Sequence, residues 1–455
     1  MKIGFNRNTW ALLTLLVLGA LCFWVAASWN VWFYNPPEPP YAGTGPSRIL
    51  LTFNDDNELH RSVTWVGSSE LEAATLELVE EQTKDTVRLD AEAEVFHSRA
   101  GQRAFYRVSL KELEWDKKYL YRVTCGDSIS PFYAFQTPED KRQKYAFMYV
   151  GDIQDTLQGT VNQTLKEAFK RSPEMEFMLC TGDLAERPMD QYWDEAFHSM
   201  DSIAQAVPVL NVAGNHDYLK NIIYELEHRF ALTFPYFLNS KKEDNHVYTL
   251  TYQDMQLFIL DSTREFFYLP AQRAWLQEKL HESLAKWKIV VLHHPLYSVK
   301  GKYQNLMQRM AFDDIIRQYD VDVVLQGHEH AYARTTNTLK DGTQTTPIYL
   351  ISHCSPKNYH IEFDERFQKF GSGSQYYQKI SVDGNELTIE AFDAQTHELY
   401  DKLTLVKNLQ GSKILDQGKN IKERVELGFE PVSKKEKKFS KRIEAYHQKH
   451  PERFN

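Results

Sequence analysis

The alternation of apolar and polar residues predicts a β-rich region near the start of the chain. Between residues 46 and 138, short runs with a period of two recur, for example at 60–65, 104–110 and 118–123. A period of two places alternate side chains on the two faces of a strand, so that one face can be buried. Several short strands at this spacing predict a β-sandwich over residues 46–138.

A different pattern begins at about residue 144. Apolar, β-branched runs there alternate with stretches that predict helices, at 160–171, 190–205, 222–230, 270–286 and 306–319. Strands that alternate with helices are typical of a layered α/β domain, which we expect to span residues 144–407. Further period-two segments predict a second sheet stacked on the first, at 246–261, 377–382, 386–392 and 399–405.

The first 28 residues have the pattern of an export signal. Lys2 and Arg7 precede an uninterrupted apolar run from Trp10 to about Ala27. A basic segment followed by such a run is typical of a signal peptide, and about 18 apolar residues also suffice to cross a bilayer. Residues 1–28 are therefore either a cleaved signal peptide or a retained anchor, which would contact the membrane through residues 10–28. Both alternatives predict an extracytoplasmic protein that is secreted, periplasmic or membrane-anchored.

The remaining segments differ from the two predicted domains in composition. Residues 29–45 are rich in proline and predict a stiff linker. Residues 408–455 are rich in lysine and predict a charged helix or a disordered tail. The net charge of −9 gives no electrostatic basis for nucleic-acid binding. The sequence does not indicate an oligomeric state.

Five apolar runs end in a turn that carries aspartate, asparagine or histidine. The turns lie at residues 151–155, 182–186, 214–217, 293–295 and 327–330. Side chains at the carboxyl ends of strands can point into one common crevice. Carboxylate and imidazole groups suit zinc, iron and manganese, and one carboxylate can bridge two cations. The five turns together therefore predict one dinuclear metal centre.

Two cations at such a centre favour hydrolysis of phosphate esters. When they lie about 3.5–4 Å apart, they can generate hydroxide at neutral pH and hold a phosphoryl group for in-line attack. The motif set GD, GDxx, GNHD, VxxH and GHxH resembles the calcineurin-like metallophosphoesterases, and its spacing is most similar to that of purple acid phosphatases. The resemblance covers residues 45–407. It implies a fibronectin type III-like sandwich, as a packing partner or a wall of the crevice, followed by a four-layer α/β/β/α domain.

The resemblance also implies a role for each polar residue of the turns. Asp152 and His330 would bind the first metal, and Asp183 would bridge the two metals. The second metal would be bound by Asn215, His293 and His328. His216 would hydrogen-bond the phosphate and protonate the leaving oxygen, and Asp217 would orient His216.

Two positions depart from the family pattern. Purple acid phosphatases carry a tyrosine that binds ferric iron in the second motif, and this chain has Glu186 there. Gln154 occupies a position where many other metallophosphoesterases have a histidine ligand. Either Gln154 or Glu186 could complete the first metal site. We therefore expect no purple chromophore, and iron, manganese and zinc all remain candidate metals.

The candidate substrate contacts also differ from those of the family. The loop 296–304 lacks the histidine that usually meets the substrate, and Lys300, Lys302 and Tyr303 are the available replacements. His294, beside the predicted ligand His293, could also face the substrate. We select His294 and Tyr303 as substrate-binding residues.

These features predict an exported phosphoesterase with two divalent or trivalent metal ions. The resemblance implies attack on a phosphate ester by a metal-bound hydroxide while His216 assists the leaving group, and it favours monoesters. One alternative is a phosphodiesterase or pyrophosphatase that uses the same centre. Another is a surface binding protein whose metal site is vestigial, an alternative kept open by Gln154 and Glu186.

Overall fold

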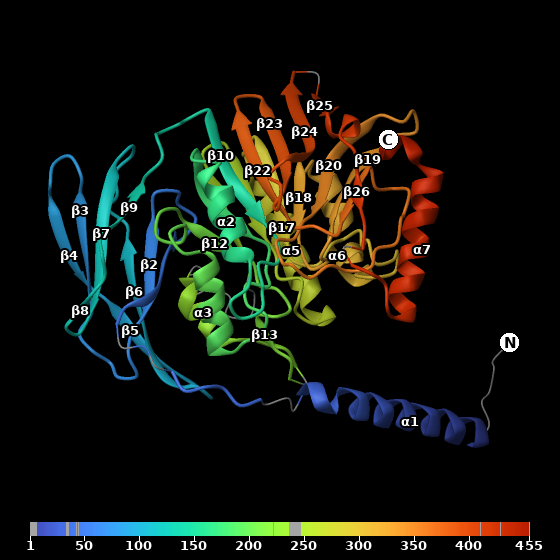
Figure 1. The fold of residues 1–455 in the computed structure, drawn as a ribbon, viewed down its shortest axis with the longest axis horizontal. Coiled ribbons are helices and arrows are strands. Elements are labelled where there is room, and N and C mark those ends of the chain that lie inside the picture. Colours follow the sequence, from blue (N-terminus) through green and yellow to red (C-terminus); the bar gives the residue numbers. More distant parts are fainter. Residues whose placement is uncertain are drawn as a thin grey trace.

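A computed structural model gives the fold of the chain and describes residues 7–32, 36–41, 43, 45–221, 223–235, 247–409, 411–427 and 429–454 (Figure 1). Parts of the predicted linker (33–35, 42 and 44), Ile222 and His246 lie outside the described residues. Helix α1 (Arg7–Trp32) extends away from the body of the molecule (Figure 1). Its segment Ala11–Trp29 is long and apolar enough to cross a membrane, a property that signal sequences share.

The amino-terminal domain is a sandwich of two antiparallel sheets. One sheet has the order β1 (Ser47–Phe53), β2 (Arg61–Val66), β6 (Gly101–Leu110), β5 (Glu92–Ser98). The other has the order β4 (Thr86–Asp90), β3 (Thr75–Glu80), β7 (Lys118–Cys125), β8 (Ser128–Ile129), with β9 (Tyr133–Gln136) also paired to β7. Inward-facing residues of both sheets form one core, in which the rings of Trp65 and Tyr106 stack at 5.6 Å.

The second domain contains two larger sheets. The first has the order β12 (Val209–Asn211), β11 (Met175–Cys180), β10 (Lys144–Val150), β22 (Tyr376–Asp383), β23 (Glu386–Asp393), β24 (Leu399–Asn408), β25 (Gly411–Asp416). The second has the order β15 (Tyr248–Tyr252), β16 (Met255–Ile259), β17 (Trp287–Leu292), β18 (Val323–Gln326), β20 (Gln344–Ile351), β19 (Tyr332–Thr338), β21 (Lys369–Ser372), β26 (Arg424–Val425). Residues of both sheets share the largest apolar core, so the sheets pack face to face.

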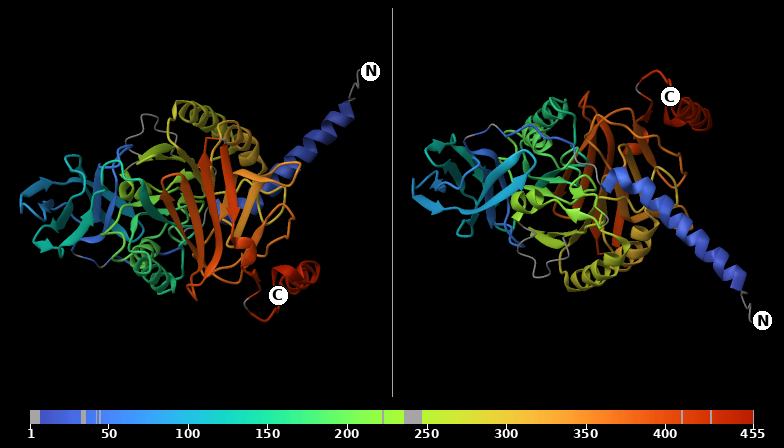
Figure 2. Two further views of the ribbon diagram at one scale, coloured as in Figure 1. Left: turned by 90° about the horizontal axis from the view of Figure 1, so that it is seen from above. Right: turned by 90° about the horizontal axis from the view of Figure 1, so that it is seen from below.

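Helices cover the outer faces of the two sheets (Figure 2). α2 (Val161–Lys170) and α3 (Asp190–Ser199) pack on the seven-stranded sheet, and α5 (Leu269–Glu282) and α6 (Leu306–Gln318) pack on the eight-stranded sheet. The prediction of a β-sandwich followed by a four-layer α/β/β/α domain is therefore confirmed. Short 3-10 helices lie at Phe266–Tyr268 (η2), Gly418–Asn420 (η3) and Pro451–Arg453 (η4).

The helix predicted at 222–230 is wrong for its described residues. The chain instead forms a small hairpin of β13 (Tyr218–Leu219) and β14 (Glu225–Leu226), followed by the short helix α4 (His228–Thr233). The backbone N–H of Glu227 donates to the carbonyl of Asp217, so tertiary pairing with the metal-motif turn outweighs local helical periodicity. The helix predicted at 190–205 ends earlier, at Ser199.

The charged segment 408–455 is part of the domain rather than a free tail. We expected 246–261 and the segments from 377 to 405 to form one second sheet, and this is wrong: β15 and β16 belong to the eight-stranded sheet, whereas β22, β23 and β24 belong to the seven-stranded sheet. Beyond residue 405, β25 adds an edge strand to the seven-stranded sheet and β26 pairs with β21. The carboxyl-terminal helix α7 (Lys434–Lys449) buries Phe439, Ile443 and Tyr446 against the body. These residues follow the i, i+4, i+7 spacing of one helix face, which the high lysine content obscures.

The sandwich and the second domain are joined by buried polar contacts. Arg48 in β1 donates to Asp194 at 2.7 Å and forms an ion pair with Asp190 at 3.0 Å. The hydroxyl of Tyr121 donates to the carbonyl of Gln205 at 3.0 Å. Because these side chains come from two sandwich strands, the sandwich has a fixed position on the second domain.

Arg334 is expected to be essential for stability. It lies on β19, is buried, and donates to Asp401 of β24 at 2.7 Å and to Asp416 of β25 at 3.0 Å. Arg334→Ala would leave the buried Asp401 without its cation, and we expect it to lower the free energy of unfolding by about 3–5 kcal/mol. Arg88→Ala is the control, because its exposed ion pair with Glu77 should contribute less than about 1 kcal/mol. Equal denaturant midpoints for the two variants would contradict the expectation.

Candidate metal centre

The predicted metal ligands lie at the carboxyl ends of strands from both large sheets. Asp152, Asp183 and Asn215 follow the parallel strands β10, β11 and β12 of the seven-stranded sheet. His293 and His328 follow the parallel strands β17 and β18 of the eight-stranded sheet. Since the two sheets are stacked, these strand ends meet at one edge of the domain.

The backbone at three of these positions is left-handed. Asp152, Asp183 and His328 have φ of 44°, 54° and 68°. Such conformations are uncommon for residues other than glycine and tend to occur at functional sites, where surrounding contacts hold them. Close packing adds a second constraint, because a Cβ atom at Gly214 would lie 2.2 Å from the backbone nitrogen of Asp183. The turns therefore place their side chains at the centre by means of backbone conformations that are uncommon for residues other than glycine.

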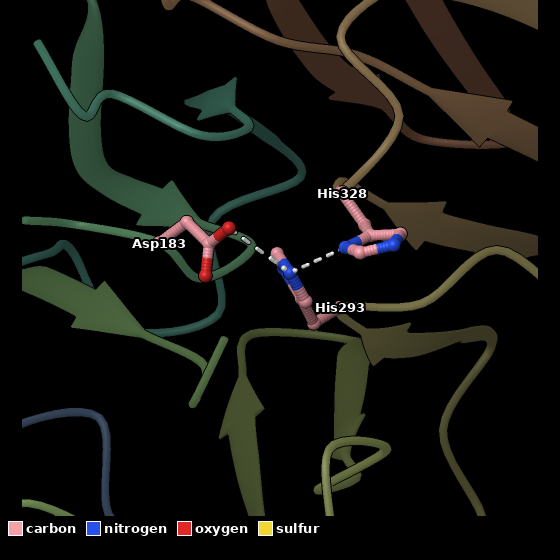
Figure 3. Close-up of side chains that lie close together, drawn as sticks. All are labelled: Asp183, His293 and His328. Atoms are coloured by element: carbon pink, nitrogen blue, oxygen red, sulfur yellow. Dashed lines mark hydrogen bonds and ion pairs between the residues drawn. The ribbon is translucent and has the colours of Figure 1, made fainter. Parts of the chain in front are cut away.

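One group of side chains has the composition of a metal site: Asp183, His293 and His328, which Figure 3 shows, together with Asn215. The Nε2 atom of His293 lies 3.3 Å from Oδ2 of Asp183, 3.1 Å from Oδ1 of Asn215 and 3.3 Å from Nδ1 of His328. The same Asn215 oxygen lies 2.7 Å from Nδ1 of His328. One carboxylate oxygen, one amide oxygen and two imidazole nitrogens thus converge, which is a donor set suited to zinc, iron or manganese.

A second group of candidate ligands adjoins Asp183. Oδ1 of Asp152 is 3.8 Å from Nε2 of His330, and the backbone N–H of Gln154 donates to the carbonyl of Asp183 at 3.2 Å. Asp152 Oδ1, His330 Nε2 and Gln154 Oε1 are all buried without a hydrogen-bond partner among the described residues. Buried polar atoms are nearly always paired, so three orphaned acceptors together fit a bound cation.

The electrostatics of the carboxylates also fit a cationic centre. Burial, together with the charge of Asp183, raises the pKa of Asp152 well above its ordinary range. Burial opposes ionisation of Asp183 too, but the imidazoles of His293 and His216 outweigh it and hold the pKa of Asp183 well below its ordinary value. The pKa of His293 rises to about 9, because Asp183 and Asp152 outweigh the effect of burial. Two neighbouring buried carboxylates are stabilised by positive charge, which a bound cation would supply.

The other imidazoles are held in the neutral form that binds metals. Burial lowers the pKa of His330 to about 3 and that of His328 well below its ordinary value, and the neighbouring His294 and His293 add to the effect at His328. Nδ1 of His330 lies 2.9 Å from the carbonyl of Lys357, which leaves Nε2 as the free acceptor.

The two departures from the family pattern lie in contact with each other. Nε2 of Gln154 donates to a carboxylate oxygen of Glu186 at 3.0 Å, while Oε1 of Gln154 is one of the three orphaned acceptors. Glu186 therefore holds the amide nitrogen of Gln154, and the buried amide oxygen is left available to a cation. This arrangement makes Gln154 the better candidate ligand and Glu186 the residue that holds it.

Removal of Glu186 is expected to weaken one metal position. Glu186→Ala would free the amide of Gln154 to rotate, and loss of such an outer contact typically lowers metal affinity by about 10–100-fold. Metal titration followed by calorimetry would measure the change, with Glu278→Ala on the exposed face of α5 as the matched control. Unchanged affinity in both variants would show that Glu186 has no role at the centre.

His216 lies beside the centre, and Asp217 has a different partner from the one we expected. The backbone N–H of His216 donates to Oδ1 of Asp183 at 2.8 Å, and Nδ1 of its ring lies 2.5 Å from the carbonyl of Glu186. The carboxylate of Asp217 instead accepts from the backbone N–H groups of Gly214 at 2.8 Å and Asp183 at 3.2 Å. Asp217 thus holds the two metal turns together, and Glu186 is the residue that orients the His216 ring.

The two predicted substrate-binding residues have different surroundings. The ring of His294 lies 4.3 Å from that of His328, and burial lowers the pKa of His294 to about 3. Tyr303 is 74% exposed and lines a separate surface hollow with Gly301 and Glu362. The structure therefore brings His294, and not Tyr303, to the centre.

Tyr359 is a residue at the centre that the sequence did not reveal. Its ring stacks on His330 at 4.4 Å, and its backbone N–H donates to the carbonyl of His330 at 3.1 Å. The ammonium groups of Lys300 and Lys357 lie 4.7 Å and 5.6 Å from the centre of the Tyr359 ring. Tyr359 lies in a loop without a recognisable motif, so only its position after the end of β20 at Ile351 could have suggested it.

A cavity of about 660 Å³ opens beside His216 and Glu186. Part of it is formed by residues of the second domain, including Met189 and Leu219. The remaining wall of the cavity is formed by residues 96–99, at the end of strand β5 in the sandwich. Pro36 and Glu38, from the segment that precedes the sandwich, complete it. The sandwich therefore contributes directly to a space next to the metal centre.

Comparison with known proteins gives two family matches. Residues 145–332 match the calcineurin-like phosphoesterase family, and residues 46–137 match the purple acid phosphatase N-terminal domain. Purple acid phosphatase 1 of Ipomoea batatas is 29% identical over 245 residues, which are 50% of this chain and 51% of that protein. Phosphoenolpyruvate phosphatase of Allium cepa is 29% identical over 252 residues, which are 50% of this chain and 49% of that protein. Purple acid phosphatase 5 of Arabidopsis thaliana is 26% identical over 343 residues, which are 69% of this chain and 80% of that protein. This chain thus matches about half the length of the first two relatives.

Solved structures show the same fold. A purple acid phosphatase from yellow lupin (Lupinus luteus) seeds has a TM-score of 0.65 at 16% identity, over 86% of this chain and 77% of that chain. A structure of PhoD has a TM-score of 0.60 at 13% identity, over 90% of this chain and 99% of that chain. At these identities the likeness concerns the fold alone.

Proposed function

We propose that this chain, which combines a calcineurin-like phosphoesterase domain with a purple acid phosphatase N-terminal domain, is a metal-dependent hydrolase of phosphate monoesters. The observation that carries the proposal is the convergence of Asp183, Asn215, His293 and His328, together with the unpaired buried acceptors of Asp152, Gln154 and His330. A structural polar cluster would have its acceptors paired, whereas a metal centre needs them free.

Two metal ions would be held by residues of both large sheets. Asp152, Gln154 and His330 would hold the first, Asp183 would bridge, and Asn215, His293 and His328 would hold the second. When bound, such ions supply a nucleophile at neutral pH and neutralise the charge that develops on the phosphate. The donor set suits iron, manganese and zinc. Because position 186 is a glutamate and not a tyrosine, we expect no purple chromophore.

His216 is positioned to deliver a proton to the leaving oxygen. Its backbone is fixed to Asp183, and its Nδ1–H donates to the Glu186 carbonyl, so Nε2 is the ring nitrogen available to the substrate. His216 also lines the cavity of about 660 Å³. The organic part of the ester would occupy this cavity, where its oxygen meets the imidazole as the P–O bond breaks.

Other residues would bind the phosphate group of the ester. His294 is neutral, and its ring lies against that of His328. The ammonium groups of Lys300 and Lys357, both near the Tyr359 ring, would attract the dianionic phosphate toward the centre. These lysines would take the place of the histidine that the loop 296–304 lacks.

The site of action would be outside the cytoplasm. The apolar helix α1 at the amino terminus supports export, by either a cleaved signal or a retained anchor. A protein that is secreted, periplasmic or membrane-anchored fits both alternatives.

Phosphodiesters are the second candidate substrates, because the cavity beside His216 has room for a further organic group. We would compare p-nitrophenyl phosphate with its bis ester, using the full chain supplied in turn with manganese, zinc and iron. Higher kcat/KM on the monoester would support the proposal, and higher kcat/KM on the bis ester would favour a phosphodiesterase. The absence of turnover on both esters would leave a binding protein with a vestigial metal site.

A further inference from the structure

The cavity beside His216 lies close to the end of helix α1. Pro36 and Glu38 both line this cavity, and Pro36 lies only four positions after Trp32, the last residue of α1. Four residues span at most about 14 Å even when fully extended. Figures 1 and 2 show the carboxyl end of α1 next to the hairpin that contains β13, whose residues Tyr218 and Leu219 also line the cavity.

The segment that follows α1 is fixed to the body of the protein. Glu38 forms an ion pair with Arg99 at 2.8 Å, and its side chain is only 2% exposed. A second oxygen of Glu38 accepts from the backbone N–H of Asp190 at 3.1 Å. Glu38 therefore anchors the chain to both the sandwich and the second domain, and the cavity cannot move far from the end of α1.

The side chains of the cavity suit an ester with an apolar leaving group. Phe96, Met189 and Leu219 provide apolar surface. The lining is also charged, with the cations Arg187 and Lys220 and the carboxylates Glu186 and Glu225. An amphiphilic phosphate ester combines these two properties in one molecule. A small sugar phosphate would leave the apolar surface without a partner.

Exposed apolar side chains lie on the loops beside this cavity. Ile223 is 58% exposed, and Phe266 and Phe267 are 64% and 53% exposed. The backbone N–H of Tyr224 donates to Glu265 at 2.5 Å, which joins the two loops that carry these residues. Aromatic and aliphatic side chains of this kind are favourable at a bilayer surface and unfavourable in water.

Building on the proposed function, we infer that α1 is retained as a membrane anchor and that the substrate is a lipid phosphate monoester embedded in the same bilayer. The reaction adds water to the ester: the water oxygen bonds to phosphorus, the P–O bond to the lipid alcohol breaks, and the leaving oxygen takes a proton from His216. Inorganic phosphate and a neutral lipid alcohol are the products. Ile223, Phe266 and Phe267 rest on the bilayer and hold the mouth of the cavity against it.

The test uses the full chain in phosphatidylcholine vesicles that contain dioleoyl phosphatidic acid or a polyprenyl phosphate. p-Nitrophenyl phosphate in the surrounding water serves as the soluble substrate. One variant has twenty Gly and Ser residues inserted after Phe33, which lets the body move away from the bilayer by a further root-mean-square distance of about 25 Å. The matched control has the same insertion after Lys340, in the exposed turn between β19 and β20.

We expect hydrolysis of at least one of the two lipid phosphates. The lipid that is hydrolysed shows whether the substrate is a glycerol-based or a polyprenyl phosphate. The insertion after Phe33 should lower that rate about tenfold through loss of effective concentration, with the soluble rate unchanged. The insertion after Lys340 should change neither rate. Turnover of the soluble ester with no hydrolysis of either lipid would overturn the inference, as would equal lipid rates for both insertions or a mature protein that lacks α1. Failure on all three substrates would overturn the proposed function itself.

A second measurement tests the contact with the bilayer. Phe266→Ser with Phe267→Ser should lower the lipid rate several-fold and leave the soluble rate unchanged. Leu284→Ser is the control, because Leu284 is 99% exposed in the loop after α5. Equal lipid rates in these variants would assign no role in membrane contact to the aromatic pair.

Discussion

Replacement of His216 by alanine is expected to lower kcat for phosphate ester hydrolysis by a factor of about 10²–10⁴. The reason is its position: the ring lies beside Asp183, is oriented by the carbonyl of Glu186 and lines the cavity for the leaving group. His216 is not one of the proposed metal ligands, so metal content should be unchanged. Steady-state kinetics combined with elemental analysis would measure both quantities.

The identity of the leaving group provides an internal control for this variant. p-Nitrophenolate leaves readily without a proton, whereas an alkoxide does not, so His216→Ala should impair an alkyl phosphate more than p-nitrophenyl phosphate. His198→Ala, at the exposed end of α3, is the matched control and should retain full activity. An equal loss on both esters would assign His216 to phosphate binding rather than to proton transfer.

Replacement of Asp183 by asparagine is expected to abolish activity and to remove both metals. Asp183 is the proposed bridge because it contacts both groups of ligands: its Oδ2 lies 3.3 Å from Nε2 of His293, and its backbone carbonyl accepts a hydrogen bond from the backbone N–H of Gln154. An amide bridges two cations poorly because it lacks the negative charge and the second equivalent oxygen. We expect a loss of at least about 10³ in kcat/KM, of the size that removal of a key electrostatic group causes.

Asp383→Asn serves as the control for the Asp183 variant. Asp383 lies at the end of β22, and its side chain is 69% exposed. Circular dichroism would show that both variants fold, so that loss of metal can be separated from loss of structure. An Asp183→Asn protein that keeps two metals and full activity would contradict the assignment of the bridge.

Much of the fold could be predicted because each region has its own periodicity. The period-two runs of the sandwich and the strand and helix alternation after residue 144 both correspond to the observed layers, and the family resemblance drawn from the motifs is confirmed by the matches over 46–137 and 145–332. The failures have physical causes. The segment 222–230 has helical spacing but pairs with the turn at Asp217, and α7 has an apolar face that its lysines obscure.

The sequence predicted which residues form the candidate centre, but it did not predict which of them contact one another. A residue within three positions of a strand's carboxyl end can be placed at the sheet edge, and this applies to Asp152, Asp183 and His293. Which groups then contact one another depends on loop conformation, which has no periodicity. For that reason the partner of Asp217, the exposure of Tyr303 and the presence of Tyr359 became evident only in the structure.

The most direct test of the account is a titration of metal-free full-length protein with manganese, zinc or iron while phosphate release from p-nitrophenyl phosphate is recorded. The account predicts that activity rises with bound metal and reaches its maximum at about two ions per chain, as a two-metal centre requires. Fewer than one bound ion per chain and no turnover with any of the three metals would contradict it.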